Sequence, residues 1–357
     1  MNGDFAEGLL ESLDWSHERV QLVHDEASGL RAVIAVHSTV LGPALGGLRI
    51  RGYRGGLAEA LDDALRLSRA MTLKASAAGL ELGGGKAVIV DDGREELRRP
   101  RLAALAAELE RLDGAYITAE DIGTTTADMD FISEHTTHVV GRSARGGCGG
   151  DPSPDTARTV LGATKAALGL LGEGSVDGLT VGVVGLGKVG GLLAEWLLAD
   201  GARVVGFDPV PAVRERMAGL GVELVDDVEA LLARRLDVLA PCAVGGLVDE
   251  KVAAAVDCRV VCGAANNPLG GTRSEAILAE RGILYVPDFI ANCGGLIHAD
   301  SERRGDGDSE RLAGALRAAT ERAEAVLVEA LESERLPGVV AEEHALARIE
   351  RARSVTA

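Results

Sequence analysis

The feature that most constrains the fold is a glycine-rich turn in the middle of the chain, within TVGVVGLGKVGGLLAEWLLADGARVVGFDP. An apolar run over 180–184 predicts a buried strand, helical spacing over 189–199 predicts a helix, and a second run over 203–207 predicts another strand. The turn has the spacing G-x-G-x-x-G, formed by Gly185, Gly187 and Gly190. A strand, such a turn, a helix and a second strand in this order predict a doubly wound α/β unit that binds a dinucleotide.

The three glycines of this turn have separate predicted roles. The first permits a tight turn, the second lets the backbone approach a pyrophosphate, and the third allows the helix to pack closely. The helix N-terminus attracts the phosphates, and an aspartate after the second strand can bind ribose hydroxyls and repel a 2′-phosphate, so NAD is favoured over NADP. The alternative is a structural glycine turn in some other α/β unit. The predicted cofactor-binding residues of this unit are Gly185, Gly187, Lys188, Val189, Gly190 and Asp208.

The rest of the chain also alternates predicted strands and helices, and 357 residues suit about two domains. A segment rich in Gly, Ser and Pro over 141–157 is the expected boundary. A helix is expected over 156–171, capped by Ser153 or Asp155, and an amphipathic pattern runs from 308 to about 333. The first part predicts a hairpin over 19–39, a loop over 41–50, a helix over 56–79, a loop entering a buried strand over 83–92, a helix over 99–114 and a strand over 115–121.

Composition argues against several classes of protein. Acidic side chains outnumber basic ones by 55 to 37 and no basic stripe is present, so nucleic acid is not an expected partner. No run of about 18 apolar residues and no export signal are visible, so we expect no membrane association and a cytoplasmic location. The odd number of cysteines fits reduced thiols, and no metal is expected because no full ligand set occurs. The cysteines are Cys148, Cys242, Cys258, Cys262 and Cys293.

Lysine is scarce, and one lysine follows three glycines in the stretch GLELGGGKAVI. This stretch is not a phosphate-binding loop, because Leu80 stands where that motif needs glycine and Ala87 where it needs Ser or Thr. A desolvated lysine can lose its proton and act as a general base, which an arginine cannot do. We expect the glycines to leave room beside Lys86 for a substrate or a second lysine; the alternative is a solvated loop lysine. Five of the 37 basic residues are lysines: Lys74, Lys86, Lys165, Lys188 and Lys251.

A carboxylate is expected near this lysine. Asp121, in the stretch TAEDIGT, follows a predicted strand, and α/β proteins commonly place catalytic groups at the carboxyl ends of strands. The alternative is that Asp121 caps the next helix.

Motifs spread over about residues 30 to 300 give the chain a family resemblance. In collinear order they are LGPALGGLR, AMTLK, GLELGGGKAVI, YITAEDIGT, ADMD, GDPSPDTA, VGLGKVG, APCAVGG, CGAANN and GILYVPDFIANCGGLI. The chain resembles the Glu/Leu/Phe/Val dehydrogenases, and within them most closely the leucine and valine dehydrogenases. The resemblance implies an α/β fold with an N-terminal catalytic domain over 1–150, a Rossmann domain over 151–329 and an active-site cleft between them. It further implies that a C-terminal helix, about 330–357, packs back on the first domain.

The resemblance also implies an activity, the reversible oxidative deamination of an L-amino acid by NAD to a 2-oxo acid and ammonia. By motif position, Lys74 would bind the substrate carboxylate, Lys86 would activate water, and Asp121 would carry a proton to and from the amine nitrogen. Gly46 and Gly47 would line the carboxylate site. The residues implied to contact the cofactor, in part also the substrate, are Ala243, Asn267 and Asn292.

The implied side-chain pocket is apolar. A second carboxylate would need its own cation there, so glutamate is not an expected substrate, and the resemblance ranks valine, leucine and isoleucine ahead of aromatic amino acids. An aromatic amino-acid dehydrogenase and a non-catalytic NAD-binding sensor remain as alternatives. Self-association is expected, Cys293 replaces the family's usual Ala without expected harm, and the charged segment HADSERRGDGDSER could alter domain closure or assembly. The pocket residues are Leu45, Ala119, Leu296 and Ala299.

Overall fold

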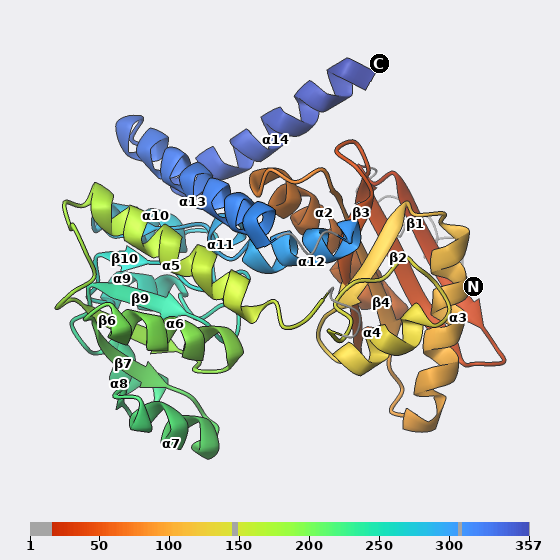
Figure 1. Ribbon diagram of the computed structural model, residues 1–357, viewed down its shortest axis with the longest axis horizontal. Coiled ribbons are helices and arrows are strands. Elements are labelled where there is room, and N and C mark those ends of the chain that lie inside the picture. Colours follow the sequence, from red (N-terminus) through yellow and green to blue (C-terminus); the bar gives the residue numbers. More distant parts are fainter. Residues whose placement is uncertain (1–15, 145–148, 306–308, 357) are drawn as a thin grey trace. The chain divides into compact units, whose positions relative to one another are not determined.

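The computed structural model describes residues 16–144, 149–305 and 309–356, and the chain divides into two compact α/β units (Figure 1). Unit 1 contains the described residues up to Ser76, Leu80–Gly150, and those from Ile349 onward. Unit 2 contains Ala77–Gly79 and the described residues of Asp151–Arg348.

Unit 1 is built on a five-stranded mixed sheet in the order β1-β2-β4-β3-β5. The expected hairpin is confirmed as β1 and β2, which pair antiparallel; β2 and β4 are also antiparallel, while β3 runs parallel to both β4 and β5. The strands are β1 (Arg19–Asp25), β2 (Leu30–Ser38), β3 (Ala44–Arg51), β4 (Gly83–Val90) and β5 (Tyr116–Glu120).

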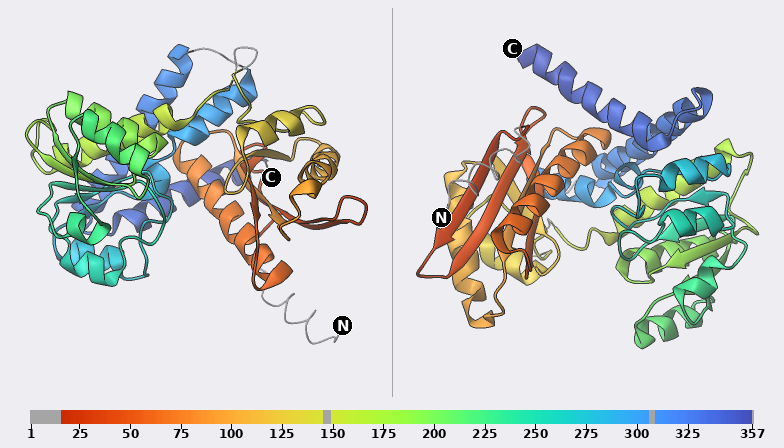
Figure 2. Two further views of the ribbon diagram at one scale, coloured as in Figure 1. Left: turned by 90° about the horizontal axis from the view of Figure 1, so that it is seen from below. Right: turned by 180° about the vertical axis from the view of Figure 1, so that it is seen from behind.

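Helices cover both faces of this sheet because each face carries its own apolar cluster. Leu102 and Leu105 of α3 and Met129 of α4 pack against one face (Figure 1). Ala60 and Leu61 of α2 pack against the other face. The ribbon of α2 lies in front of the strands in the view from behind in Figure 2. The helical segments are α2 (Gly56–Ala77), η1 (Glu95–Leu97, a 3-10 turn), α3 (Arg98–Arg111) and α4 (Thr126–Ser133).

Two segments of unit 1 that the sequence predicts to be loops are instead part of strands. The segment predicted as a loop over 41–50 contains most of β3, and the glycines predicted to precede a strand lie inside β4. Glycine is tolerated there because neighbouring groups approach the backbone closely. A β-carbon at Gly84 would lie 2.1 Å from the backbone nitrogen of Thr72, and one at Gly85 would lie 2.4 Å from the Tyr116 ring. The space that Gly84 and Gly85 leave is thus taken by protein groups.

Unit 2 is built on a six-stranded parallel sheet in the order β11-β10-β9-β6-β7-β8. The order reverses between β6 and β9, which is the arrangement of a doubly wound dinucleotide-binding fold. The strand boundaries predicted for β6 and β7 are confirmed. The strands are β6 (Thr180–Val184), β7 (Arg203–Phe207), β8 (Glu223–Leu224), β9 (Val238–Pro241), β10 (Val260–Val261) and β11 (Leu284–Tyr285).

Apolar residues of α5, α6 and α13 pack on one face of the unit 2 sheet, and those of α8, α9 and α10 pack on the other (Figure 1). The long amphipathic pattern after residue 308 is confirmed as α13. The helices are α5 (Ser153–Leu170), α6 (Lys188–Ala199), α7 (Pro211–Gly219), α8 (Val228–Leu232), α9 (Glu250–Ala255), α10 (Ser274–Glu280), α11 (Asp288–Ala291), α12 (Gly294–Arg304), α13 (Ser309–Glu332) and α14 (Pro337–Thr356).

Two expectations about helix α5, its first residue and its capping side chain, are wrong. Helix α5 begins at Ser153 rather than 156, and its N-cap is Pro152 with no capping side chain, so neither Ser153 nor Asp155 caps it. The charged segment after His298 is largely helical, because it forms the end of α12 and the start of α13; residues 306–308 lie outside the described residues.

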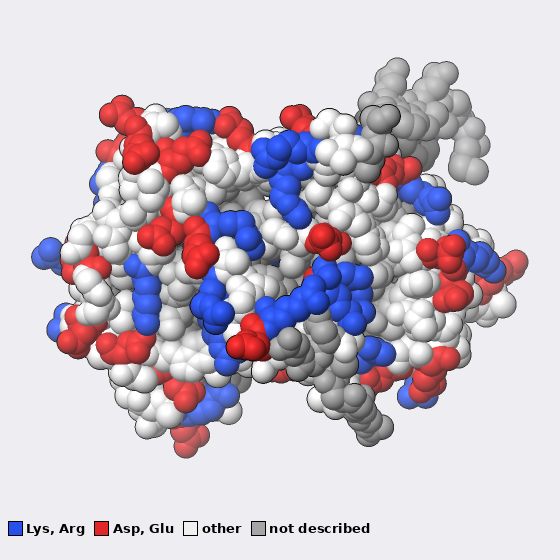
Figure 3. Space-filling model, turned by 45° about the horizontal axis from the view of Figure 1, so that its top comes forward, with Lys and Arg blue, Asp and Glu red and all other residues white. Residues whose placement is uncertain are grey.

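Acidic and basic side chains lie interspersed on the face displayed in Figure 3. No helix among the described residues is long and apolar enough to cross a membrane. Four cysteines are free thiols, whereas Cys148 lies outside the described residues. Within the described ranges, no three His, Cys, Asp or Glu side chains are grouped as a metal site.

Candidate active site

Lys86 and Asp121 form a close ion pair in unit 1. Lys86 lies in the middle of β4, Asp121 directly follows β5, and β3 lies between these two strands. Nζ of Lys86 donates a hydrogen bond of 2.6 Å to Oδ2 of Asp121. The Lys86 side chain is only 6% exposed, so the solvated-loop alternative is wrong. The Asp121 side chain is 23% exposed, which leaves this carboxylate accessible to a ligand.

A turn after β5 fixes the backbone at Asp121. The backbone N–H of Asp121 donates to Oγ1 of Thr124 at 2.8 Å, and that hydroxyl lies 3.0 Å from the carbonyl oxygen of Leu48 on β3. Asp121 does not cap the next helix. Thr125 is the N-cap of α4 and forms a capping box with Asp128. The Asp121 carboxylate is therefore free for a role outside local helix capping.

Sequence reasoning missed a second cation beside Asp121. Nε of Arg49 donates to Oδ2 of Asp121 at 2.9 Å, and Nη1 of Arg49 donates to Oδ2 of Asp63 at 2.8 Å. Asp63, on α2, also accepts from the Tyr53 hydroxyl at 2.8 Å and from Nη2 of Arg66 at 2.7 Å. The signal was an arginine two residues after Gly47 in LGGLRI, but it could be interpreted only once this segment was known to be a strand with alternating faces.

The surroundings lower the pKa of both Lys86 and Asp121, but for different reasons. Burial lowers the pKa of the Lys86 ammonium below its ordinary value; Asp121 opposes this effect and the like charge of Arg49 adds to it. Burial would raise the pKa of Asp121, but Lys86 and Arg49 outweigh it and hold that pKa below its ordinary value. A buried lysine whose pKa is lowered, next to a carboxylate that faces it, is suited to proton transfer.

The other predicted residues of unit 1 lie on the strands and helix that carry this pair. A β-carbon at Gly47 would lie 2.6 Å from Cβ of Asp121, so glycine there makes room for the carboxylate. A β-carbon at Gly46 would lie 1.8 Å from the carbonyl oxygen of Gly85, so glycine is needed at this position too. Lys74 is half-buried in the last turn of α2.

The glycine turn of unit 2 has the geometry that a pyrophosphate site requires. Gly185 has φ +94°, in the region that favours glycine. A β-carbon at Gly187 would meet no heavy atom of the described residues within 4 Å, whereas one at Gly190 would lie 1.9 Å from the carbonyl oxygen of Gly185. The space beside Gly187 adjoins the N-terminus of α6, which begins at Lys188 and has Val189 in its first turn. The turn therefore fits a dinucleotide.

Asp208 supports the glycine turn from the end of β7. Its Oδ2 accepts from the backbone N–H of Leu186 at 2.9 Å, and its Oδ1 accepts from the backbone N–H of Val210 at 2.9 Å. The residue is only 7% exposed. Part of its predicted ribose-binding capacity is thus used to hold the turn itself, which sequence reasoning did not anticipate.

Three further predicted cofactor contacts follow other strands at the same carboxyl edge of the sheet. Ala243 is exposed, and its Cβ would lie 2.6 Å from a β-carbon at Gly185. Asn267 is exposed with φ +50°. Asn292 is 3% exposed; its Nδ2 donates to Ala264 and Asn266 at 3.0 Å, but its buried Oδ1 has no partner among the described residues. An unpaired buried acceptor fits a polar ligand such as a carboxamide.

Comparison with known proteins identifies the family. The model for the Glu/Leu/Phe/Val dehydrogenase dimerisation domain matches residues 17–138, and the Glutamate/Leucine/Phenylalanine/Valine dehydrogenase model matches residues 210–354. A valine dehydrogenase of Streptomyces albus is 44% identical over 308 residues, which cover 85% of this chain and 84% of that protein. The chain belongs to the Glu/Leu/Phe/Val dehydrogenase family.

Two further relatives support this assignment. A leucine dehydrogenase of Geobacillus stearothermophilus is 41% identical over 293 residues, or 82% of this chain and 79% of that protein. The crystal structure of L-tryptophan dehydrogenase from Nostoc punctiforme superposes with a TM-score of 0.83 at 32% identity, over 98% of this chain and 99% of that one. The resemblance inferred from the motifs and the expected α/β fold with two domains are confirmed.

Residues that the family resemblance assigns to the substrate side chain lie in both units. In unit 1, Leu45 on β3 is buried and Ala119 on β5 is half-buried. In unit 2, Leu296 is buried and Ala299 is half-buried, both on α12. All four residues are apolar.

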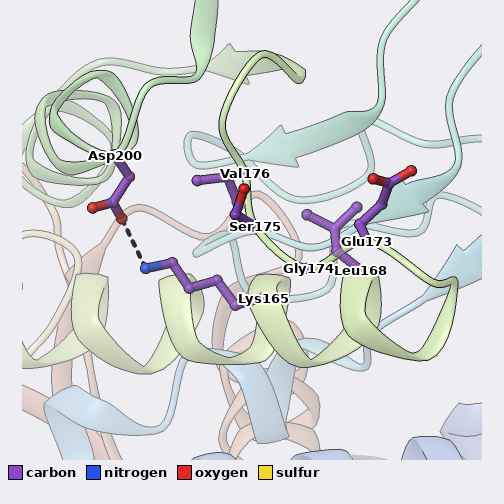
Figure 4. A pocket seen from close by; sticks show the side chains of 7 residues that line it. All are labelled: Lys165, Leu168, Glu173, Gly174, Ser175, Val176 and Asp200. Carbon is purple, nitrogen blue, oxygen red and sulfur yellow. Dashed lines mark hydrogen bonds and ion pairs between the residues drawn. The ribbon is translucent and has the colours of Figure 1, made fainter.

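A separate surface pocket of unit 2 does not match the family's cofactor site. It lies beside the end of α5 and the segment 173–176 that precedes β6, so it is at the amino edge of the parallel sheet. Ligands of doubly wound folds bind at the carboxyl edge. Figure 4 shows its one lysine, Lys165, directed at Asp200, with Nζ 2.7 Å from Oδ2. This lysine already has a partner in Asp200.

Proposed function

We propose that this chain catalyses the NAD-dependent, reversible oxidative deamination of a branched-chain L-amino acid to its 2-oxo acid and ammonia. The observation that carries the proposal is the buried Lys86–Asp121 pair, with its 2.6 Å contact and with the pKa of both partners held below the ordinary value. The relatives named valine dehydrogenase and leucine dehydrogenase support the substrate class.

Oxidative deamination needs a base at two steps, and the Lys86–Asp121 pair supplies one base for each. Lys74 holds the substrate carboxylate, and Asp121 accepts a proton from the substrate ammonium so that the α-carbon can lose hydride. NAD, when bound, would supply the hydride acceptor. Lys86, in its neutral form, then takes a proton from the water that attacks the resulting iminium. Asp121 returns its proton to the nitrogen of the carbinolamine, and ammonia leaves as the C–N bond breaks. The hydroxyl oxygen forms the carbonyl of the 2-oxo acid and releases its proton to solvent.

Cofactor selection is proposed to depend on Asp208. Each carboxylate oxygen already accepts one backbone N–H, and each retains a lone pair for a ribose hydroxyl. A 2′-phosphate would meet the carboxylate charge, so NAD is the proposed cofactor rather than NADP. Asn267 and the unpaired Oδ1 of Asn292 are proposed to bind near the nicotinamide or the substrate.

The substrate pocket favours aliphatic side chains. Its apolar residues Leu45, Ala119, Leu296 and Ala299 offer no cation for a second carboxylate. Because the chain is also similar to the structure of an L-tryptophan dehydrogenase, an aromatic amino acid is the second candidate substrate. Self-association of the chain is also proposed, since the family model for its first part describes a dimerisation domain.

A substrate panel tests the proposal directly. NADH formation at 340 nm at alkaline pH should occur with L-valine, L-leucine or L-isoleucine, faster than with L-phenylalanine or L-tryptophan, and with NAD rather than NADP. Activity confined to aromatic substrates would select the second candidate. A chain that forms no NADH with any of them would be a binding protein instead.

Substitution of the proposed base tests its role. Lys86→Ala should lower kcat by about 100-fold to 10,000-fold, the usual contribution of a general base, while NADH binding measured by fluorescence stays near that of the parent protein. Lys165→Ala is the matched control, because Lys165 is a lysine of unit 2 at the amino edge of the sheet. Near-normal kcat in Lys86→Ala would show that another group activates the water.

A further inference from the structure

A second cation completes the Lys86–Asp121 group, and none of the motif-based roles includes it. We propose that Arg49 is a positioning residue of the deamination reaction, which fixes the Asp121 carboxylate and shares its charge, so that Lys86 can release its proton. This inference rests on the proposed function and names a further residue on which the same site depends.

The two carboxylate oxygens of Asp121 have different surroundings. Lys86 and Arg49 both donate to Oδ2, at 2.6 and 2.9 Å. Among the described residues, none donates a hydrogen bond to Oδ1, and the side chain of Asp121 is 23% exposed. One oxygen is therefore anchored between two cations, while the other stays open to a substrate nitrogen. Removing Arg49 would leave the anchoring to Lys86 alone.

Arg49 is itself held rigidly. Its Nη1 donates to Asp63 at 2.8 Å while its Nε donates to Asp121, so the planar guanidinium bridges two carboxylates that lie on α2 and beyond β5. The side chains of Arg49 and Asp63 are 11% and 10% exposed. Tyr53 and Arg66 in turn hold Asp63. A lysine could supply the charge at position 49 but not this two-pronged contact.

The charges around Lys86 explain how Arg49 affects the base. Asp121 beyond β5 and Asp63 on α2 favour the ammonium form of Lys86, Arg49 on β3 disfavours it, and the neighbour on β2 is the apolar Ala35. Loss of the Arg49 charge would leave Lys86 facing two carboxylates and no cation. Loss of the Asp63 charge would leave it with one carboxylate and one cation. The two changes should therefore move the titration of Lys86 in opposite directions.

The test is the pH profile of kcat/KM for oxidative deamination of L-valine by Arg49→Met, Arg49→Lys and Asp63→Asn. The rising limb should move by about one pH unit to higher pH in Arg49→Met and to lower pH in Asp63→Asn, because a neighbouring charge shifts a pKa by at least this order. Arg49→Lys should keep the limb near its original position with a lower kcat. Arg51→Met is the matched control, since Arg51 is an exposed arginine at the end of the same strand.

A second measurement follows the titration of Lys86 directly and does not depend on catalysis. Protein labelled with ¹³C at the lysine ε-carbon has only five such sites, and Lys86→Met identifies the Lys86 signal by its absence. Its titration should shift in the same opposite directions in Arg49→Met and Asp63→Asn. Shifts in one common direction, or no shift in either variant, would overturn the proposal and leave Arg49 as a structural residue. A parent protein that forms no NADH but shows the opposite shifts would refute the proposed function and not the charge arrangement.

Discussion

Replacing Gly84 with alanine should separate helix α2 from strand β4. A β-carbon at this position would lie 2.1 Å from the backbone nitrogen of Thr72, 2.3 Å from its Oγ1 and 2.4 Å from the carbonyl oxygen of Ser68. All three atoms belong to α2, and two of them are backbone, so rotation of a side chain cannot relieve the contact. The helix must move by about an ångström or more before ordinary van der Waals distances return.

The cost of this displacement can be set against known core substitutions. Overpacking a well-packed core by one methyl group costs about 1–3 kcal/mol, and the rigid contacts at Gly84 put the expected loss near the upper end of this range, about 3 kcal/mol. That loss corresponds to a Tm lower by about 6–12 °C for a domain of this size class. Because α2 also carries Lys74, the KM for the amino acid should rise more than kcat falls.

The assay combines thermal unfolding with steady-state kinetics, and Gly52→Ala is the matched control. Gly52 lies in unit 1 without a positive φ, and a β-carbon there would meet its nearest neighbour at 3.8 Å. Its Tm and KM should stay close to those of the parent protein. Equal Tm values in Gly84→Ala and Gly52→Ala would refute the reasoning, because α2 would then not depend on close approach to β4.

Two further predictions concern carboxylates of unit 2. Asp208→Asn removes one acceptor for the backbone N–H groups of the glycine turn; a hydrogen bond to a charged group contributes about 1.5–3 kcal/mol, so NADH should bind about 10-fold to 100-fold more weakly in a fluorescence titration, and an unchanged Kd would contradict the supporting role. Glu275 accepts the backbone N–H of Gly338 at 2.7 Å, and burial raises its pKa above the ordinary 4.5. The folded state thus favours the protonated carboxyl, and its contribution to stability is lost as pH rises through the folded-state pKa. Glu275→Gln should therefore raise Tm at pH 7 and lose this advantage toward pH 4.5, whereas a pH-independent difference in Tm would contradict it.

The glycine turn of unit 2 could be predicted from sequence because its evidence is local. The strand, the turn and the helix follow one another within about twenty residues, and the positive φ of Gly185 and the close packing of Gly190 arise inside that segment. Each glycine was assigned its role from spacing alone. The same reasoning missed that Asp208 holds the backbone of Leu186, because a carboxylate's choice between protein and ligand donors depends on three-dimensional distances.

Unit 1 was harder to predict because its decisive contacts join distant residues. Glycines normally indicate a loop, yet Gly84 and Gly85 lie in a strand because Thr72 and Tyr116 press against them. Arg49 was overlooked for the same reason. Its partners Asp63 and Asp121 lie 14 and 72 residues away along the chain, so no local pattern could mark it.

The three glycines before Lys86 connect packing to chemistry. Because they carry no side chains, α2 and the Tyr116 ring come close to β4 and exclude water, and Lys86 is left 5% exposed. Burial is also the largest cause of the lowered pKa of Lys86; the charge of Arg49 adds to it, and the charge of Asp121 opposes it. A strand with larger side chains before the lysine would hold α2 away, admit water and return the pKa of the lysine toward its ordinary value. The glycine run therefore acts on the proposed base through desolvation, with the protein itself filling the space that the sequence suggested was kept for substrate.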